Sequence, residues 1–138
     1  MEKVQDTNLI CASVPSQLLA LEALRLGKAW VTPKLEELAR VRSDVYASLG
    51  KLGDIVQFPR TQGAFYILMR LPPVDDVMAF NRAMIEKHKV ATIPGFAFGL
   101  ADPAAGNYQR LSFGALQPAT AAEGVQRFLA AVRDWYSA

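Results

Sequence analysis

Arg110 is the residue whose type and setting in this sequence most strongly suggest chemistry. It stands in YQRLSF (108–113), where polar and apolar residues alternate as in a strand with one buried face. The period of two puts Leu111 and Phe113 on one face and Arg110 on the other. A planar guanidinium held in mid-strand on an uncovered face suits a bidentate grip on a carboxylate. The alternative from spacing alone is a surface arginine whose head group extends into solvent.

A turn rich in glycine and proline, PGFAFG, precedes this strand. Pro94 has a fixed φ angle, whereas Gly95 and Gly99 permit positive φ values and the close approach of a ligand or of another backbone. One interpretation is therefore a loop that lies close to a ligand, with Pro94, Gly95, Phe96 and Gly99 as its candidate residues. The alternative is an ordinary turn with its two aromatic rings packed against the protein.

The other potentially reactive residues give weaker evidence of catalytic or metal-binding chemistry. Cys11 lies in an apolar run, and only His88 could act as its base, so we predict a buried structural cysteine. His88 stands at an expected helix end, where we predict that it is solvated, and it has no metal-ligand spacing to a cysteine or a second histidine. The phosphate-binding pattern GxxxxGK[ST] is absent. The sequence predicts neither a metal site nor a complete set of catalytic residues.

Composition restricts the class of protein. The 138 residues are 51% apolar and 20% charged, which is typical of a globular domain with its own core. Fifteen Lys and Arg against 13 Asp and Glu leave a net charge of +2 spread along the chain, so we predict no nucleic-acid partner. A single cysteine, no signal peptide, and no apolar run near the roughly 18 residues of a membrane span predict a cytoplasmic protein.

The elements expected to position Arg110 are four helices and four short strands. The first helix ends at Gly27 and a second, longer one is capped by Thr32. A third is capped by Asp75 or Asp76, and a capping box at 120–123 begins the last. The expected strands lie within 54–58, 63–71, 89–93 and 108–113.

This order predicts an α/β fold of the α+β type. We expect a small mixed sheet of about three to four strands, with helices mainly on one face and a long interdomain helix before it. The open face of that sheet would carry Arg110.

Segments in the same order resemble the C-terminal, small-domain part of class I/II pyridoxal-phosphate (PLP) aminotransferases of fold type I. They are SVPSQLLALEAL, LARVRSDVYASL, QGAFYILMRL, VATIPGFAFG and YQRLSFG, and together they cover nearly the whole chain. The resemblance implies that Arg110 holds the α-carboxylate of an amino-acid or 2-oxo-acid substrate. It also implies that the loop at Pro94–Gly99 lies at the mouth of the active site.

The resemblance also implies that the chain lacks the cofactor-binding groups. In the family, the Schiff-base lysine lies before SVPSQ in a Ser-Lys context, and no lysine here has that setting; they are Lys3, Lys28, Lys34, Lys51, Lys87 and Lys89. We therefore expect PLP in the parent enzyme, none bound by this chain, and no transamination by the chain alone. Residues 1–30 would be the tail end of the PLP-binding large domain, and 31–138 the small domain with the linking helix.

A small domain without its large domain should expose apolar surface, for instance around NLIC (8–11) and on the face of Tyr108. We expect homo-oligomers for that reason, with the missing large domain as the other partner. The alternative functions are a stand-alone amino-acid-binding or dimerisation module, as in a truncated pseudoenzyme, and part of a related PLP carbon–sulfur lyase.

Overall fold

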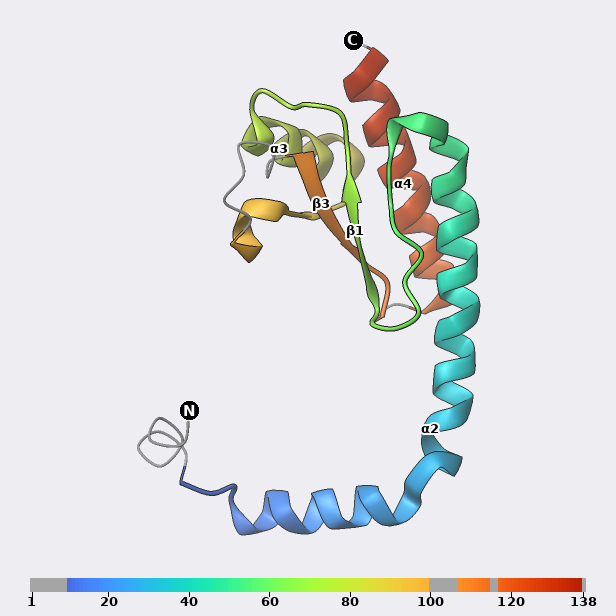
Figure 1. Ribbon diagram of the computed structural model, residues 1–138, viewed down its shortest axis with the longest axis vertical. Helices are drawn as coiled ribbons and strands as arrows, with labels where there is room; N and C mark the ends of the chain where they lie inside the picture. Colours follow the sequence, from blue (N-terminus) through green and yellow to red (C-terminus); the bar gives the residue numbers. More distant parts are fainter. Residues whose placement is uncertain (1–9, 100–106, 115–116, 138) are drawn as a thin grey trace. The chain divides into compact units, whose positions relative to one another are not determined.

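The computed structural model of the chain describes residues 10–99, 107–114 and 117–137 (Figure 1). The chain divides into two compact units, Met1–Glu37 and Leu38–Ala138. The division falls inside helix α2 (Val14–Leu49). The prediction that residues 1–30 are the tail of a large domain is not tested by this division and stays a prediction.

Helix α2 is interrupted at Gly27, where the backbone has φ 57° and ψ −153°. Glycine alone adopts this conformation without strain, which confirms the predicted helix end there. The predicted cap at Thr32 is wrong, because the helix resumes after Gly27 and Pro33 lies inside it. Pro33 is in the second turn after the break, so its missing N–H removes only one backbone hydrogen bond.

The first unit exposes much apolar surface. Its described part is one helix with a short lead-in, which cannot bury an apolar face by itself. Cys11 is exposed, so the prediction of a buried cysteine is wrong. Ile10 is 80% exposed, as expected for the end of NLIC; residues 8 and 9 lie outside the described residues. The large exposed apolar side chains of the helix include Leu18, Leu19, Leu24 and Trp30.

The second unit contains a three-stranded sheet in the order β1-β3-β2. Its strands are β1 (Tyr66–Arg70), β2 (Ile93–Pro94) and β3 (Tyr108–Ser112). The predicted fold class is confirmed, although both described pairings are antiparallel rather than mixed. The segment expected as a strand at 54–58 forms the end of a 3-10 turn, η1 (Gly50–Ile55), and a single bridge from Gln57 to Arg70.

Helices cover one face of this sheet. Figure 1 shows α3 (Val77–His88) and α4 (Pro118–Ser137) next to the strands, with the C-terminal part of α2 alongside. The core joins side chains of all three helices to the inward residues of β1 and β3. Its fully buried members are Leu49, Ile67, Met69, Phe80, Met84, Phe113, Phe128 and Val132. The opposite face of the sheet is left uncovered by these helices.

Helix α3 begins where the sequence predicts. Between the two candidate caps, the structure selects Asp76, whose carboxylate accepts hydrogen bonds from the backbone N–H groups of Met78 and Ala79, both at 2.9 Å. Lys89, with φ 54°, ends the helix in a left-handed conformation. The local signals for α3 were therefore sufficient to place it.

Replacing Asp76 by alanine is expected to lower the free energy of unfolding by about 1 kcal/mol, because two N–H groups of the first turn lose their acceptor. Urea denaturation followed by circular dichroism measures this. Asp75→Ala is the matched control, since it removes the same charge from the neighbouring position, which makes none of the described side-chain hydrogen bonds. Equal losses in the two variants would mean that charge, rather than capping, stabilises the helix.

Helix α4 begins earlier than predicted. The backbone N–H of Ala121 donates to the carbonyl of Gln117 at 2.9 Å, and Pro118 occupies the first helical position. The predicted capping box at 120–123 is therefore wrong, because proline with its fixed φ suits the first turn and the helix has started before Thr120. Glu123 instead pairs with Arg127 one turn later, at 2.6 Å.

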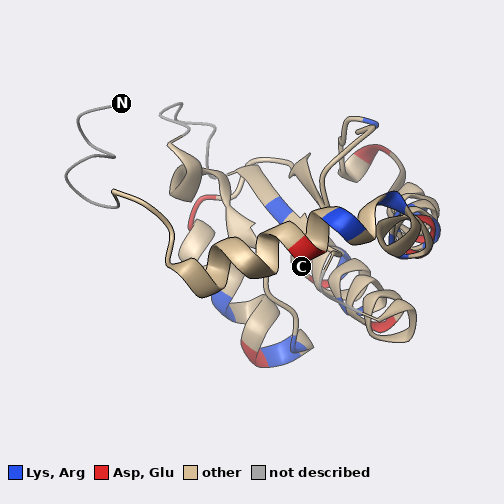
Figure 2. Cartoon of the chain, turned by 90° about the horizontal axis from the view of Figure 1, so that it is seen from below, with Lys and Arg blue, Asp and Glu red and all other residues tan. Residues whose placement is uncertain are grey.

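The charged residues of the helices are mixed in sign. Figure 2 shows Lys and Arg segments interspersed with Asp and Glu segments along the chain. Among the helices that the structure describes, none combines the length and the apolar character needed to cross a membrane.

Candidate functional site

Arg110 lies in the middle of the central strand of the sheet. Its Cα is opposite Leu68 of β1 on one side and Ile93 of β2 on the other, so hydrogen-bonded strands hold its backbone from both edges. The neighbouring Gln109 and Leu111 are buried, whereas Arg110 is partly exposed. The face predicted from the period of two is therefore the face that Arg110 occupies.

Two aromatic rings lie close to the guanidinium of Arg110. Its Cζ lies 4.3 Å from the ring centroid of Phe98 and 5.1 Å from that of Tyr66. Its Nε is buried and has no hydrogen-bond partner in the described part of the chain. No carboxylate among residues 10–99, 107–114 and 117–137 lies within ion-pair distance of it. Buried donors without a partner are uncommon in proteins, which makes Arg110 a candidate binding group.

The turn that precedes the loop lies beside Arg110. Pro94 pairs with Gln109 in the sheet, and the 3-10 turn η2 (Gly95–Phe98) follows directly. Gly99 closes the turn with φ 74°, and its N–H donates to the carbonyl of Phe96 at 3.1 Å. Both glycines of the turn permit a positive φ, and Gly99 has one. Gly95 is buried, with φ outside that region.

Sequence reasoning missed Phe98 as a residue of this site and named Phe96. Both side chains are about half exposed, at 45% and 49%, and both are aromatic. In a 3-10 turn, residues two apart point in different directions, so only one ring can reach the guanidinium. The sequence contains no signal that chooses between them.

Tyr66 reaches Arg110 from the neighbouring strand. Its Cα is opposite Ser112, two residues from Arg110 along β3, so Tyr66 and Arg110 are diagonal neighbours on the open face. Long and aromatic side chains at such positions interact readily. The sequence predicts the two strands but does not predict the register that brings Tyr66 and Arg110 together.

The arrangement presents a positively charged group that has no ion-pair partner among the described residues. Strands β1, β2 and β3 contain no lysine, and the described residues contain no group of His, Cys, Asp and Glu that could hold a metal ion. Two described lysines are engaged elsewhere: Lys87 pairs with Asp134, and Lys89 donates to the carbonyl of Glu86. The strands that hold Arg110 therefore supply a guanidinium and no lysine amine.

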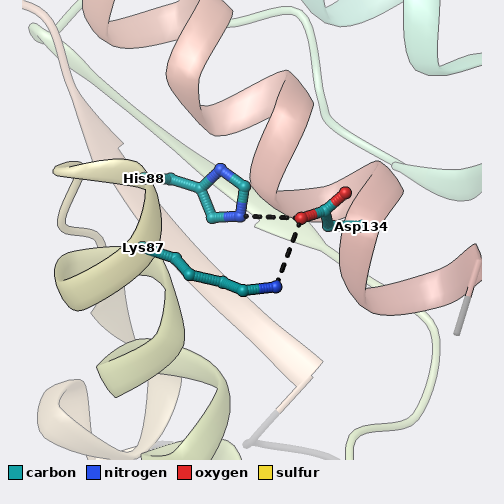
Figure 3. A network of polar contacts seen from close by, with 3 residues as sticks. All are labelled: Lys87, His88 and Asp134. Atoms are coloured by element: carbon teal, nitrogen blue, oxygen red, sulfur yellow. Dashed lines mark hydrogen bonds and ion pairs between the residues drawn. The ribbon is translucent and has the colours of Figure 1, made fainter.

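His88 belongs to a separate polar cluster between α3 and α4 (Figure 3). Its Nε2 lies 3.3 Å from Oδ2 of Asp134, and Nζ of Lys87 lies 3.5 Å from the same oxygen. The prediction of a solvated histidine is wrong, because the side chain is only 16% exposed. Helix α4 covers it, a contact between segments far apart in the sequence. This cluster joins the two helices and is not part of the Arg110 site.

Burial also affects Tyr136 near the end of α4. Its hydroxyl donates to the carbonyl of Pro72 at 2.9 Å, and desolvation raises the pKa of Tyr136 to about 12. The group therefore stays protonated in the neutral pH range and links α4 to the segment that follows β1.

The fold is that of part of an aminotransferase. It matches the α-aminoadipate aminotransferase of Thermus thermophilus, solved with N-(5′-phosphopyridoxyl)-L-leucine, over 98% of this chain with a TM-score of 0.83 and 23% identity. The aspartate aminotransferase of Thermotoga maritima matches over 99% of the chain with a TM-score of 0.74 and 26% identity. The chain covers 35% and 32% of these two structures.

The chain belongs to the family described as aminotransferase class I and II, whose model matches residues 1–128. An aromatic aminotransferase of Arabidopsis thaliana is 36% identical over 116 residues, which is 83% of this chain and 28% of the relative. A probable aspartate aminotransferase of Methanocaldococcus jannaschii is 30% identical over 134 residues, 97% of this chain and 32% of the relative. The chain thus spans about a third of the length of these relatives, and the resemblance found in the sequence is confirmed.

Proposed function

We propose that these 138 residues are the substrate-carboxylate-binding part of a PLP-dependent amino-acid aminotransferase. The observation that carries the proposal is the guanidinium of Arg110, which faces away from the helices and has no carboxylate partner among the described residues. A bound carboxylate would accept charge-assisted hydrogen bonds from it, worth about 1.5–3 kcal/mol each.

The substrate class follows from what the similar proteins have in common. Their names refer to aromatic amino acids, aspartate and α-aminoadipate, whose side chains differ in size and charge. The group shared by these amino acids and the corresponding 2-oxo acids is the α-carboxylate. Binding by Arg110 would therefore serve all of them. The aminotransferase names also favour this reaction over carbon–sulfur lyase chemistry.

The residues of this chain would bind and orient the substrate, whereas PLP, where bound, supplies the electron sink for reaction at the α-carbon. Groups for the cofactor would come from the roughly two-thirds of the relatives' length that this chain does not span. The turn with Pro94, Gly95, Phe96 and Gly99 would border the substrate and exclude water, which strengthens the ion pair at Arg110. The exposed apolar surface of the first unit supports a large domain and a second copy as partners.

A titration with propionate tests the carboxylate-binding part of the proposal, because propionate carries a carboxylate and little else. The Nε–H resonance of Arg110 in a ¹H–¹⁵N spectrum is expected to shift in a saturable way, with an affinity on the order of millimolar. The side-chain resonances of the other arginines report non-specific effects. A spectrum in which Arg110 does not respond, or responds no more than exposed arginines do, would contradict the proposal.

The purified chain is expected not to transaminate. Supplied with PLP, L-aspartate and 2-oxoglutarate, it should form glutamate no faster than PLP without protein, since the strands that hold Arg110 contain no lysine. Chromatographic measurement of glutamate gives the rate. Turnover above the PLP background that is lost after borohydride reduction would reveal a Schiff-base lysine in this chain and contradict this part of the proposal.

A further inference from the structure

We propose that Phe98 is a positioning residue for Arg110: its ring orients the guanidinium for a carboxylate without using any of its hydrogen-bond donors. The inference rests on the proposed function, because it takes Arg110 as the carboxylate-binding group. It assigns a role to a residue that the sequence patterns did not single out.

The ring of Phe98 is the nearer of the two against the guanidinium, at 4.3 Å compared with 5.1 Å for Tyr66. A cation within about 6 Å of an aromatic centroid is attracted by the negative face of the ring. The attraction involves the π-face of Phe98, which accepts no conventional hydrogen bond. The guanidinium therefore keeps its N–H groups for a ligand while the ring limits its motion.

An ion pair with a carboxylate of the protein would also hold the arginine, but it would block the site. An internal carboxylate would fix the guanidinium more strongly, but it would occupy the donor edge that a substrate carboxylate needs. No such carboxylate is paired with Arg110 in the described ranges. Aromatic contacts are the means by which this site orders a long, flexible side chain before the ligand arrives, which lowers the entropy lost on binding.

The two rings are attached to the fold in different ways. Tyr66 belongs to β1, which pairs with β3 over five residue positions. Phe98 is the last residue of a short turn that is connected to β3 through the two residue pairs of β2. The position of the turn therefore controls the position of Phe98. By linkage, a carboxylate that orders Arg110 also favours the arrangement of the turn in which Phe98 contacts it.

Phe98→Leu tests the inference in the full 138-residue chain. The substitution keeps an apolar side chain and removes the ring, so propionate is expected to bind roughly three- to tenfold more weakly. The heteronuclear NOE of the Arg110 Nε–H in the unliganded chain is expected to fall, which shows that the guanidinium has become more mobile. Phe98→Tyr restores the ring and is expected to recover both properties, whereas a purely space-filling role would not distinguish leucine from tyrosine in this way.

Tyr108→Leu is the matched control. Tyr108 is an aromatic residue on the same strand and the same face as Arg110, but it is not among the rings that contact the guanidinium. Tyr108→Leu is expected to leave both the propionate affinity and the mobility of Arg110 unchanged. If Phe98→Leu does not fold, as seen in its amide spectrum, Phe98→Met provides the same comparison with a flexible apolar side chain.

The outcomes separate this inference from the proposed function. Unchanged affinity and unchanged Arg110 mobility in Phe98→Leu, with binding still dependent on Arg110, would overturn the role of Phe98 and leave the proposed function intact. Propionate binding that persists in Arg110→Gln would overturn the proposed function itself. Equal losses in Phe98→Leu and Phe98→Tyr would also overturn the inference, because the ring would then not be the cause.

Discussion

Arg110→Gln is expected to remove measurable propionate binding. Glutamine keeps a polar side chain of moderate length but loses the positive charge and the paired N–H donors that match a carboxylate. Two charge-assisted hydrogen bonds contribute on the order of 3 kcal/mol in total, which corresponds to a loss of affinity of about 100-fold. Starting from a millimolar affinity, the variant would not saturate at any practical concentration of propionate. Titration by NMR measures the change.

Two further variants define the cause of that loss. Arg110→Lys keeps the charge without the planar fork and is expected to retain only part of the affinity. Arg70→Gln is the matched control, since Arg70 is an exposed arginine two residues from Leu68, which lies opposite Arg110. It is expected to bind propionate as the unmodified chain does. Equal losses in Arg70→Gln and Arg110→Gln would mean that general positive charge, rather than a built site, attracts the anion.

Arg110→Gln should change the free energy of unfolding very little. Arg110 makes no ion pair with the described residues, and its buried Nε has no partner. Removing the guanidinium therefore removes its contacts with the aromatic rings, which are stabilising, and also removes an unsatisfied buried donor, which is destabilising. A loss of several kcal/mol in Arg110→Gln would assign the residue a structural role and contradict the interpretation as a binding group.

Phe128→Ala is expected to lower the free energy of unfolding of the second unit by about 3–5 kcal/mol. Phe128 is completely buried on α4, in the core that this helix shares with the inward residues of β1 and β3. The loss combines the transfer free energy of the ring with the cavity that remains, because neighbouring elements relax only in part. Small domains have total stabilities of roughly 5–15 kcal/mol, so the variant would be close to unfolding.

Urea denaturation, monitored by the fluorescence of Trp135, measures this loss because Trp135 packs edge-on against Phe80 of the same core. Gln126→Ala is the control on the exposed side of α4 and is expected to change stability by no more than about 0.5 kcal/mol. A loss below about 1 kcal/mol in Phe128→Ala would show that α4 does not close the core as the structure describes.

The sequence by itself determined the features that depend on neighbouring residues. The alternation in β3 put Arg110 on the face opposite Leu111, and the structure has the same arrangement. Asp76 was one of two predicted caps, and its carboxylate bonds the next N–H groups of α3. The break at Gly27 followed from the conformations open to glycine. These signals depend on residues that are close together in the chain, so they can be recognised in the sequence.

Only the tertiary structure decided the contacts between distant segments. Phe98 rather than Phe96 lies against Arg110, His88 is covered by α4, and Cys11 remains exposed. Each outcome depends on which element packs above a residue and in what register, and local patterns do not specify this. The site itself is of this kind: the sequence supplied the arginine and its face, whereas the pairing of β3 with β1 and β2 brought the two aromatic rings to the guanidinium.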